Sequence, residues 1–162
     1  MGARYPMPAG ELDRVTDSAH VALRAFVAVA VRALDAAGVG LTVPQYRALA
    51  VLSLNGAQTA GRLAGLLGVD PSTVTRMCDR LVRQRLIRRR ADPSDRRSVM
   101  VELTATGEQV IEDVTHHRRI ELAKVLRAIP AARRNLLVEV LEEFATAAGE
   151  TPGEAWPSSA VP

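Results

Sequence analysis

Hydrophobic residues recur with helical spacing in the first long segment of the chain, residues 11–37, which contains no proline or glycine. Its apolar positions fall on one side of a helix with 3.6 residues per turn. They are Leu12, Val15, Ala19, Leu23, Phe26 and Ala30. A helix over residues 105–128 is predicted after a cap at Thr104, and another runs from Pro130 to about residue 148. Long helices are therefore expected at both ends of the chain.

Two helices are predicted in residues 42–54 and 59–67, each introduced by a capping residue. Thr42 and Gln45 match a capping box, in which each side chain accepts the backbone N–H of the other residue. Thr59 can cap the second helix with its hydroxyl oxygen. The leucines expected on the inner side of that helix are Leu63, Leu66 and Leu67.

A further helix follows the turn at Gly68, because Asp70 is a favourable N-cap and Pro71 suits the first helical position. It is expected to run to about residue 84. A short helix, a tight turn and a second helix form a helix-turn-helix, whose second helix can enter the major groove of DNA. The core-facing residues of this second helix are Val74, Met77, Cys78 and Leu81. The outward residues are Ser72, Thr73, Thr75, Arg76, Arg80 and Arg83.

The hydrophobic period changes to two in residues 86–90 and 98–103, which predicts a β-hairpin. Its connecting loop, residues 91–97, has the turn-forming composition of a wing. The predicted fold is mainly α (α+β): a winged helix-turn-helix with long terminal dimerisation helices, in the order α-α-α-α-β-β-α-α.

One compact domain accounts for most of the 162 residues, of which 48% are hydrophobic. Glycine and proline gather at both ends of the chain, which predicts flexible tails there. The expected parts are an N-terminal tail 1–10, a domain 11–148 with a DNA-binding lobe of about 42–104 and dimerisation helices of about 11–37 and 105–148, and a C-terminal tail 149–162.

The positive charge is concentrated in one segment, although the net charge is only +3. Residues 76–97 contain nine arginines and three aspartates, a local net charge of +6. Such a cluster suits a phosphate backbone, although a solvated arginine-rich face is the simpler interpretation. Arg76 is the best candidate for a bidentate contact with guanine. Arg80 and Arg83 fit phosphate contacts or intramolecular pairs better than base contacts.

In the loop, Asp95 can hold Arg97 extended toward a minor groove, unless the two form only an exposed surface pair. Ser72 and Thr73 can serve as helix caps, as DNA contacts, or as both. The candidate DNA-binding residues are Thr59, Ser72, Thr73, Thr75, Arg76, Arg80, Arg83, Asp95, Arg96 and Arg97.

These segments together resemble the MarR family of transcription regulators. The resemblance rests on Leu41-Thr42-Val43-Pro44-Gln45-Tyr46, on residues 68–76, on Asp79-Arg80-Leu81, and on Asp92-Pro93-Ser94-Asp95-Arg96-Arg97 closing with Leu103-Thr104. It spans roughly residues 11–148. It implies a homodimer whose first, fifth and sixth helices interlock, with two lobes on a pseudo-palindromic double-stranded operator about one DNA turn apart.

The resemblance also implies repression that a small aromatic or phenolic effector relieves by binding between the dimerisation helices and the DNA-binding lobe. It places Tyr46 and Arg47 near that crevice. A helix-packing role for Tyr46 and simple exposure of Arg47 are the alternatives, and we favour packing for Tyr46.

Other classes of site find little support. Cys78 raises the alternative of an oxidant sensor, but its inward position favours a buried, apolar-like thiol. His116 and His117 are adjacent rather than spaced for a helical metal site, and no catalytic motif is present, so we expect no enzyme, metal or cofactor. An architectural DNA binder without effector is a further alternative. No signal peptide or membrane span is evident, so a cytoplasmic location is expected.

Overall fold

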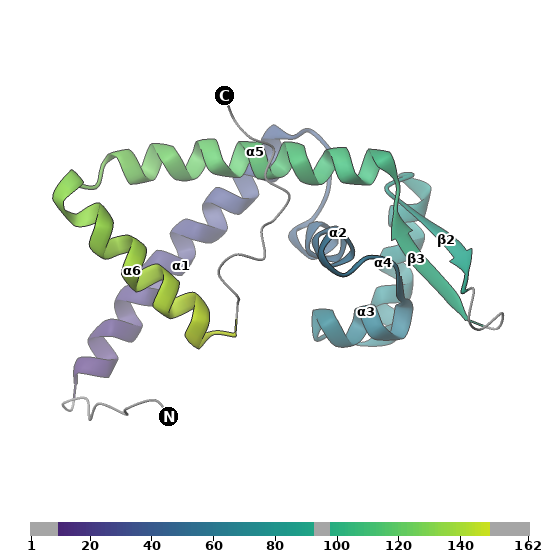
Figure 1. Cartoon of the computed structure of the whole chain (residues 1–162), viewed down its shortest axis with the longest axis horizontal. Coiled ribbons are helices and arrows are strands. Elements are labelled where there is room, and N and C mark those ends of the chain that lie inside the picture. The colour runs from purple at the N-terminus through teal and green to yellow at the C-terminus, as the bar shows by residue number, and fades with distance from the viewer. Residues whose placement is uncertain (1–9, 93–97, 150–162) are drawn as a thin grey trace.

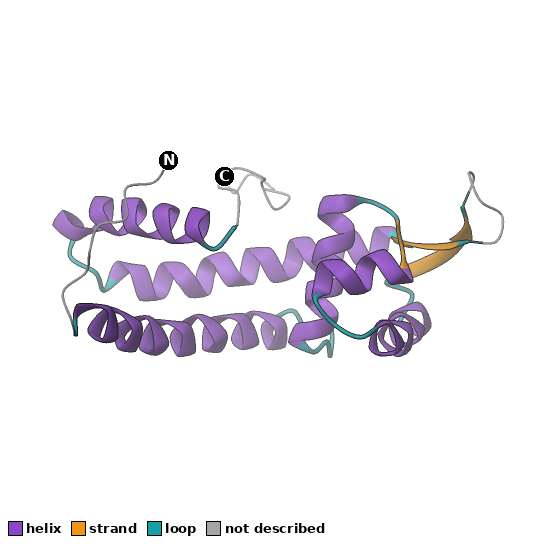
Figure 2. Ribbon diagram, turned by 90° about the horizontal axis from the view of Figure 1, so that it is seen from below, coloured by secondary structure: helices purple, strands orange, loops and turns teal. Residues whose placement is uncertain are grey.

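A computed structural model of the chain describes residues 10–92 and 98–149, which form an elongated, mostly helical molecule (Figure 1). The elements are α1 (Glu11–Ala36), α2 (Val43–Asn55), β1 (Gln58–Thr59), α3 (Ala60–Leu67), α4 (Pro71–Arg83), β2 (Ile87–Ala91), β3 (Val99–Leu103), α5 (Ala105–Arg127) and α6 (Ala131–Ala147). Helix α5 runs along most of the molecule, from the hairpin at one end to α6 at the other (Figure 1). Figure 2 shows α1 and α6 on either side of α5 at the end away from the hairpin. The mainly α winged-helix fold is confirmed.

Local capping chemistry sets the helix starts as the sequence predicts. The side chain of each predicted N-cap accepts a backbone N–H; these caps are Thr42, Thr59, Asp70 and Thr104. At the first of them the capping box is complete, because the Thr42 N–H also donates to Gln45 Oε1 at 2.9 Å. Pro71 occupies the first turn of α4, where a missing N–H costs no helical hydrogen bond.

The sheet has three antiparallel strands in the order β1-β3-β2, one strand more than predicted. The additional strand, β1, pairs Gln58 with Val101 and Thr59 with Met100. Two residues are too few to show a hydrophobic period, so β1 could not be predicted from the sequence. The chain order is therefore α-α-β-α-α-β-β-α-α.

The buried face of α4 packs into the core of the lobe that residues 42–104 form. Val74, Cys78 and Leu81 are at most 1% exposed, and Met77 packs partly buried against the same core. This agrees with the predicted inner face. Leu66 of α3 does not agree: it is 41% exposed, so the inward position predicted for it is wrong.

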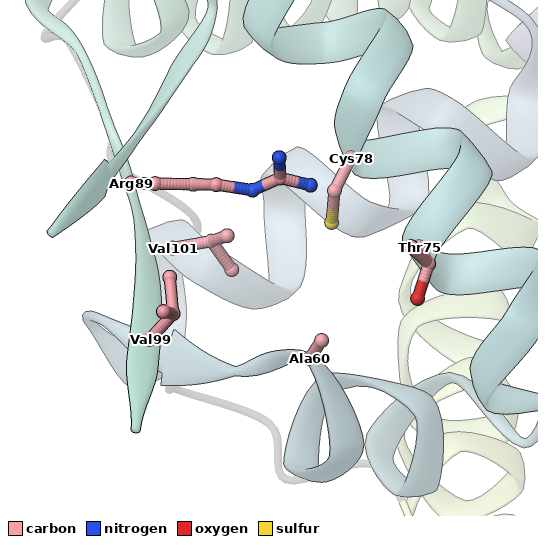
Figure 3. Close-up of a pocket in the computed structure, with 6 residues that line it drawn as sticks. All are labelled: Ala60, Thr75, Cys78, Arg89, Val99 and Val101. Atoms are coloured by element: carbon pink, nitrogen blue, oxygen red, sulfur yellow. The ribbon is translucent and has the colours of Figure 1, made fainter. Parts of the chain in front are cut away.

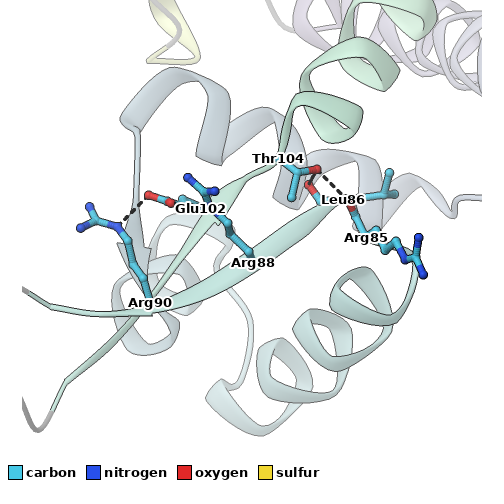
Figure 4. Close-up of polar contacts among 6 residues, drawn as sticks. All are labelled: Arg85, Leu86, Arg88, Arg90, Glu102 and Thr104. Atoms are coloured by element: carbon cyan, nitrogen blue, oxygen red, sulfur yellow. Dashed lines mark hydrogen bonds and ion pairs between the residues drawn. The ribbon is translucent and has the colours of Figure 1, made fainter.

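The hairpin is joined directly to α5 by hydrogen bonds at Thr104 (Figure 4). The Thr104 hydroxyl donates to the carbonyl oxygen of Arg85 at 2.7 Å, and the Thr104 N–H donates to that of Leu86 at 3.1 Å. The same hydroxyl oxygen accepts the Gly107 N–H at 3.1 Å. The first turn of α5 is thereby fixed to the start of β2.

The terminal helices leave large apolar surfaces uncovered. In α1 only Val29, Ala33 and Leu34 are buried, and α6 buries none of its residues. The large hydrophobic side chains exposed on these two helices are Leu12, Val15, Val21, Leu23, Phe26, Val27, Val31, Leu136, Val138, Val140, Leu141 and Phe144. The apolar face predicted for residues 11–37 therefore points mainly away from the chain's own core.

Candidate nucleic-acid interface

One face of α4 carries the predicted DNA-binding residues, and all of them are exposed. They are Ser72, Thr73, Thr75, Arg76, Arg80 and Arg83. The opposite face is held in the core, which fixes the helix and leaves its polar side chains on the surface. A helix presented in this way has the form of a recognition helix.

The first turn of α4 is organised by Asp70. Its Oδ1 accepts the Ser72 N–H at 2.7 Å, and the Ser72 hydroxyl also donates to this carboxylate. The Thr75 hydroxyl donates to the Pro71 carbonyl oxygen at 3.0 Å. Asp70 is therefore the cap, and Ser72 supports it. Of the three hydroxyl groups in this turn, those of Ser72, Thr73 and Thr75, only that of Thr73 has no hydrogen-bond partner among the described residues.

We expect the start of α4 to weaken in acid. The hydrogen bonds from the Ser72 hydroxyl and amide hold the pKa of Asp70 below its ordinary value of 3.8. A carboxyl whose pKa is lowered on folding contributes stability above its unfolded pKa and loses it as pH falls through its folded pKa. NMR titration of Asp70 should place its pKa below 3.8, and Asp70→Asn, which retains the cap without titrating, should remove that part of the acid dependence. A pKa at or above 3.8 would contradict the expectation.

The arginines of the basic segment fall into two groups. Arg76, Arg80 and Arg83 of α4 form no ion pair or side-chain hydrogen bond within residues 10–92 and 98–149. Phosphate contacts or intramolecular pairs were predicted for Arg80 and Arg83. Neither arginine forms an intramolecular pair with a described residue. Their guanidinium groups are left available to an external anion.

The arginines of β2 are instead paired with carboxylates. Glu102 accepts from both Arg88 and Arg90, each at 2.7 Å, and the two pairs lie on one face of the hairpin (Figure 4). The pKa of Glu102 is lowered by both arginines, and the hydrogen bond from Arg88 has the largest effect. On the other face Arg89 donates to Asp79 of α4 at 2.6 Å. Part of the predicted positive charge is thus neutralised within the lobe.

The remaining predicted DNA contacts lie elsewhere. Thr59 is half-buried, caps α3 by accepting the Arg62 N–H at 3.2 Å, and belongs to β1. Asp95, Arg96 and Arg97 lie outside the described residues.

A pocket of about 220 Å³ lies between α1, α2 and α5, at the junction predicted for an effector. Its lining consists of Ala30, Leu34, Val43, Tyr46, Arg47, Val114 and Arg118. Tyr46 is 7% exposed and its hydroxyl lies 3.4 Å from that of Thr115, so it packs in the core as favoured and also forms a wall of the pocket. Arg118 lies over the Tyr46 ring, with its guanidinium carbon 5.9 Å from the ring centroid.

Comparison with known proteins decides the family. The model of the MarR family matches residues 41–99. "Multiple antibiotic resistance protein MarR" of Salmonella typhimurium is 34% identical over 104 residues, 61% of this chain and 72% of that protein. This chain belongs to the MarR family. The HTH-type transcriptional repressor MdtR of Bacillus subtilis is 36% identical over 87 residues, 54% of this chain and 56% of that protein.

The MarR fold extends over nearly the whole chain. The crystal structure of RV1404 from Mycobacterium tuberculosis is similar with a TM-score of 0.81 and 38% sequence identity, covering 90% of this chain and 99% of that one. Other curated relatives match over a shorter part. The chain spans about half their length: 47% and 54% of two uncharacterized HTH-type transcriptional regulators of Bacillus subtilis.

Cys78 of this MarR family member is placed unfavourably for oxidation. Its side chain is 1% exposed, and burial raises the pKa of the thiol above its ordinary value of 9.0. The reactive form of cysteine is the thiolate, which a raised pKa disfavours. The inward position predicted for Cys78 is confirmed.

The described part of the chain contains no cluster of three or more His, Cys, Asp or Glu side chains that could hold a metal ion. None of its helices combines the length and the apolar character that crossing a membrane requires.

Sequence reasoning missed the residues that act across elements. Asp79 and Glu102 are the partners of the β2 arginines, and Arg118 lines the pocket beside Tyr46. The only available signal was the i,i+4 spacing of Val114 and Arg118, which places them on one face of α5 without showing what that face meets.

Proposed function

We propose that this MarR family protein is a sequence-specific DNA-binding transcription regulator that inserts α4 into the major groove. The observation that carries the proposal is a row of three arginines, Arg76, Arg80 and Arg83, on the exposed face of a helix whose other face is fixed in the core. None of the three forms an ion pair with a described residue. Arginine can bind guanine or phosphate with two parallel hydrogen bonds. Repression rather than activation is proposed by analogy with MdtR, which is named a repressor.

The proposed assembly is a homodimer in which α1, α5 and α6 pack against the same helices of a second copy. Its support is the apolar surface of α1 and α6, which is larger than isolated exposed hydrophobic residues would explain. Residues 42–104 then act as the DNA-binding lobe of each copy. Two-fold symmetry would set two recognition helices about 34–36 Å apart, which matches adjacent major grooves on a pseudo-palindromic operator.

The effector is proposed to bind in the pocket beside Tyr46 and Arg47. Its volume of about 220 Å³ is sufficient for one aromatic ring, because a cavity of about 150 Å³ holds benzene. The walls offer apolar side chains from three helices, and Arg47 and Arg118 can pair with an anionic or phenolic group. Since α5 connects this pocket with the hairpin, occupancy can change the position of the lobe and release DNA.

The experiment that tests the proposal compares DNA of two sequences. The purified full chain is titrated with a duplex from upstream of its own gene and with a scrambled duplex of the same length and composition, at two salt concentrations. A preference for the upstream duplex that persists at the higher salt is expected for a sequence-specific regulator. Equal and strongly salt-dependent binding would instead identify an architectural DNA binder, and the absence of binding to either duplex would contradict regulation of its own promoter.

A further inference from the structure

The wing hairpin stands away from the recognition helix over part of its length. A pocket of about 290 Å³ separates α4 from the two strands (Figure 3). At the base of the hairpin, Ile87 and Val101 are at most 2% exposed and pack in the core. Toward the loop, Val99 is 53% exposed although it lines the same pocket. Apolar packing therefore holds the base of the hairpin and not its distal half.

One ion pair spans this gap. Arg89 extends from β2 across the pocket toward α4 (Figure 3), and its Nη2 donates to Asp79 Oδ1 at 2.6 Å. This hydrogen bond ties the side chain of a hairpin residue directly to the side chain of a residue of α4. Both side chains are 44% exposed, so the pair is only partly screened by solvent.

We propose that Asp79 and Arg89 are a positioning pair that fixes the angle of the wing relative to the recognition helix and thereby determines DNA sequence discrimination. The proposal rests on the proposed DNA-binding function. A recognition helix and a wing contact different parts of the DNA, so both sets of contacts form together only when their relative orientation is correct. Without the pair, the distal hairpin can turn about its packed base, and only one set of contacts forms well.

The direction of the Arg89 side chain distinguishes this role from a phosphate contact. Its guanidinium group points toward Cys78 and α4 and is paired with Asp79, whereas Arg76, Arg80 and Arg83 form no ion pair with a described residue. If Arg89 contacted phosphate, removing the charge of Asp79 would free it and increase affinity for every sequence. A positioning pair predicts the opposite for the specific duplex, because loss of either partner releases the wing.

Glu102 provides a matched control. It accepts from Arg88 and Arg90 within the hairpin and has no hydrogen bond to α4. Glu102→Gln and Asp79→Asn each remove one negative charge from the lobe, so they change the long-range attraction to DNA equally. Only Asp79→Asn breaks the contact between the wing and α4.

The experiment measures the affinity of the full chain for the upstream and scrambled duplexes at one salt concentration. The variants are Asp79→Asn, Arg89→Gln, Glu102→Gln and the exchanged double variant Asp79→Arg/Arg89→Asp. Both single variants of the pair should lower the ratio of specific to non-specific affinity about tenfold, within the range of coupling between neighbouring charged groups. Glu102→Gln should change the ratio by less than about twofold, and the exchange should restore most of it.

A second measurement tests the pair without DNA. In the free protein, Asp79→Asn should accelerate hydrogen exchange at the distal pairs Arg90–Met100 and Ala91–Val99 more than Glu102→Gln does, with an unchanged unfolding midpoint. If the wild type prefers neither duplex, the proposed function fails, and exchange rates alone decide whether the pair holds the wing. An unchanged affinity ratio despite a clear preference of the wild type, a rise in affinity for both duplexes on Asp79→Asn, or equal exchange in the two variants would overturn the proposal.

Discussion

Gly107→Ala is expected to lower the free energy of unfolding by about 3 kcal/mol, because a methyl group has no space at this position. A Cβ on Gly107 would lie 2.1 Å from the carbonyl oxygen of Leu86 and 3.2 Å from Cδ2 of Leu103. The carbonyl is backbone and already accepts the Thr104 N–H, so it cannot move without opening the junction of hairpin and α5. Urea unfolding followed by circular dichroism measures the change.

Gly65→Ala is the matched control for this substitution. Gly65 is also helical, but it is exposed on α3 and no atom lies within 4 Å of a Cβ built there. Alanine should therefore stabilise the protein by about 0.5–1 kcal/mol, the usual preference over glycine inside a helix. Equal midpoints for wild type and Gly107→Ala would show that α5 approaches β2 less closely than described.

Arg76→Ala is expected to reduce affinity for the upstream duplex by about 1–3 kcal/mol, or roughly five- to 150-fold, while affinity for the scrambled duplex changes little. Arg76 lies one turn into α4, its side chain is exposed, and it forms no hydrogen bond or ion pair within the described residues, although its charge acts on Asp70. Its removal should therefore leave the unfolding midpoint unchanged. Titration of both duplexes with wild type and variant measures the difference.

Arg83→Ala distinguishes the two kinds of arginine contact. Arg83 lies at the end of α4, where a phosphate contact is expected, so its loss should weaken binding to both duplexes similarly and reduce the salt slope by about 1. If Arg76→Ala lost the same amount of affinity for both duplexes, Arg76 would be a phosphate contact and not a base contact. Unchanged binding of Arg76→Ala to the upstream duplex would argue against base reading at Arg76.

The start of the recognition helix illustrates what the sequence determined. Asp70 and Pro71 placed the beginning of α4 correctly, because a cap and a first-turn proline act on neighbouring backbone groups. The spacing of Val74, Cys78 and Leu81 likewise identified the buried face, and the outward row opposite it followed directly. The chain order of helices and hairpin depends on such local signals.

Only the tertiary structure decided which distant groups meet. Asp79 and Arg89 lie on different elements, and their pairing depends on how the hairpin lies against α4. The same holds for the pocket that Arg118 forms with Tyr46, and for the carbonyl that excludes a side chain at Gly107. Sequence by itself determined the helices, their caps and their faces, since these follow from interactions within a few residues. Which arginines remain free for DNA, and where the lobe is tied to α5, followed from side-chain packing between elements, which no local pattern encodes.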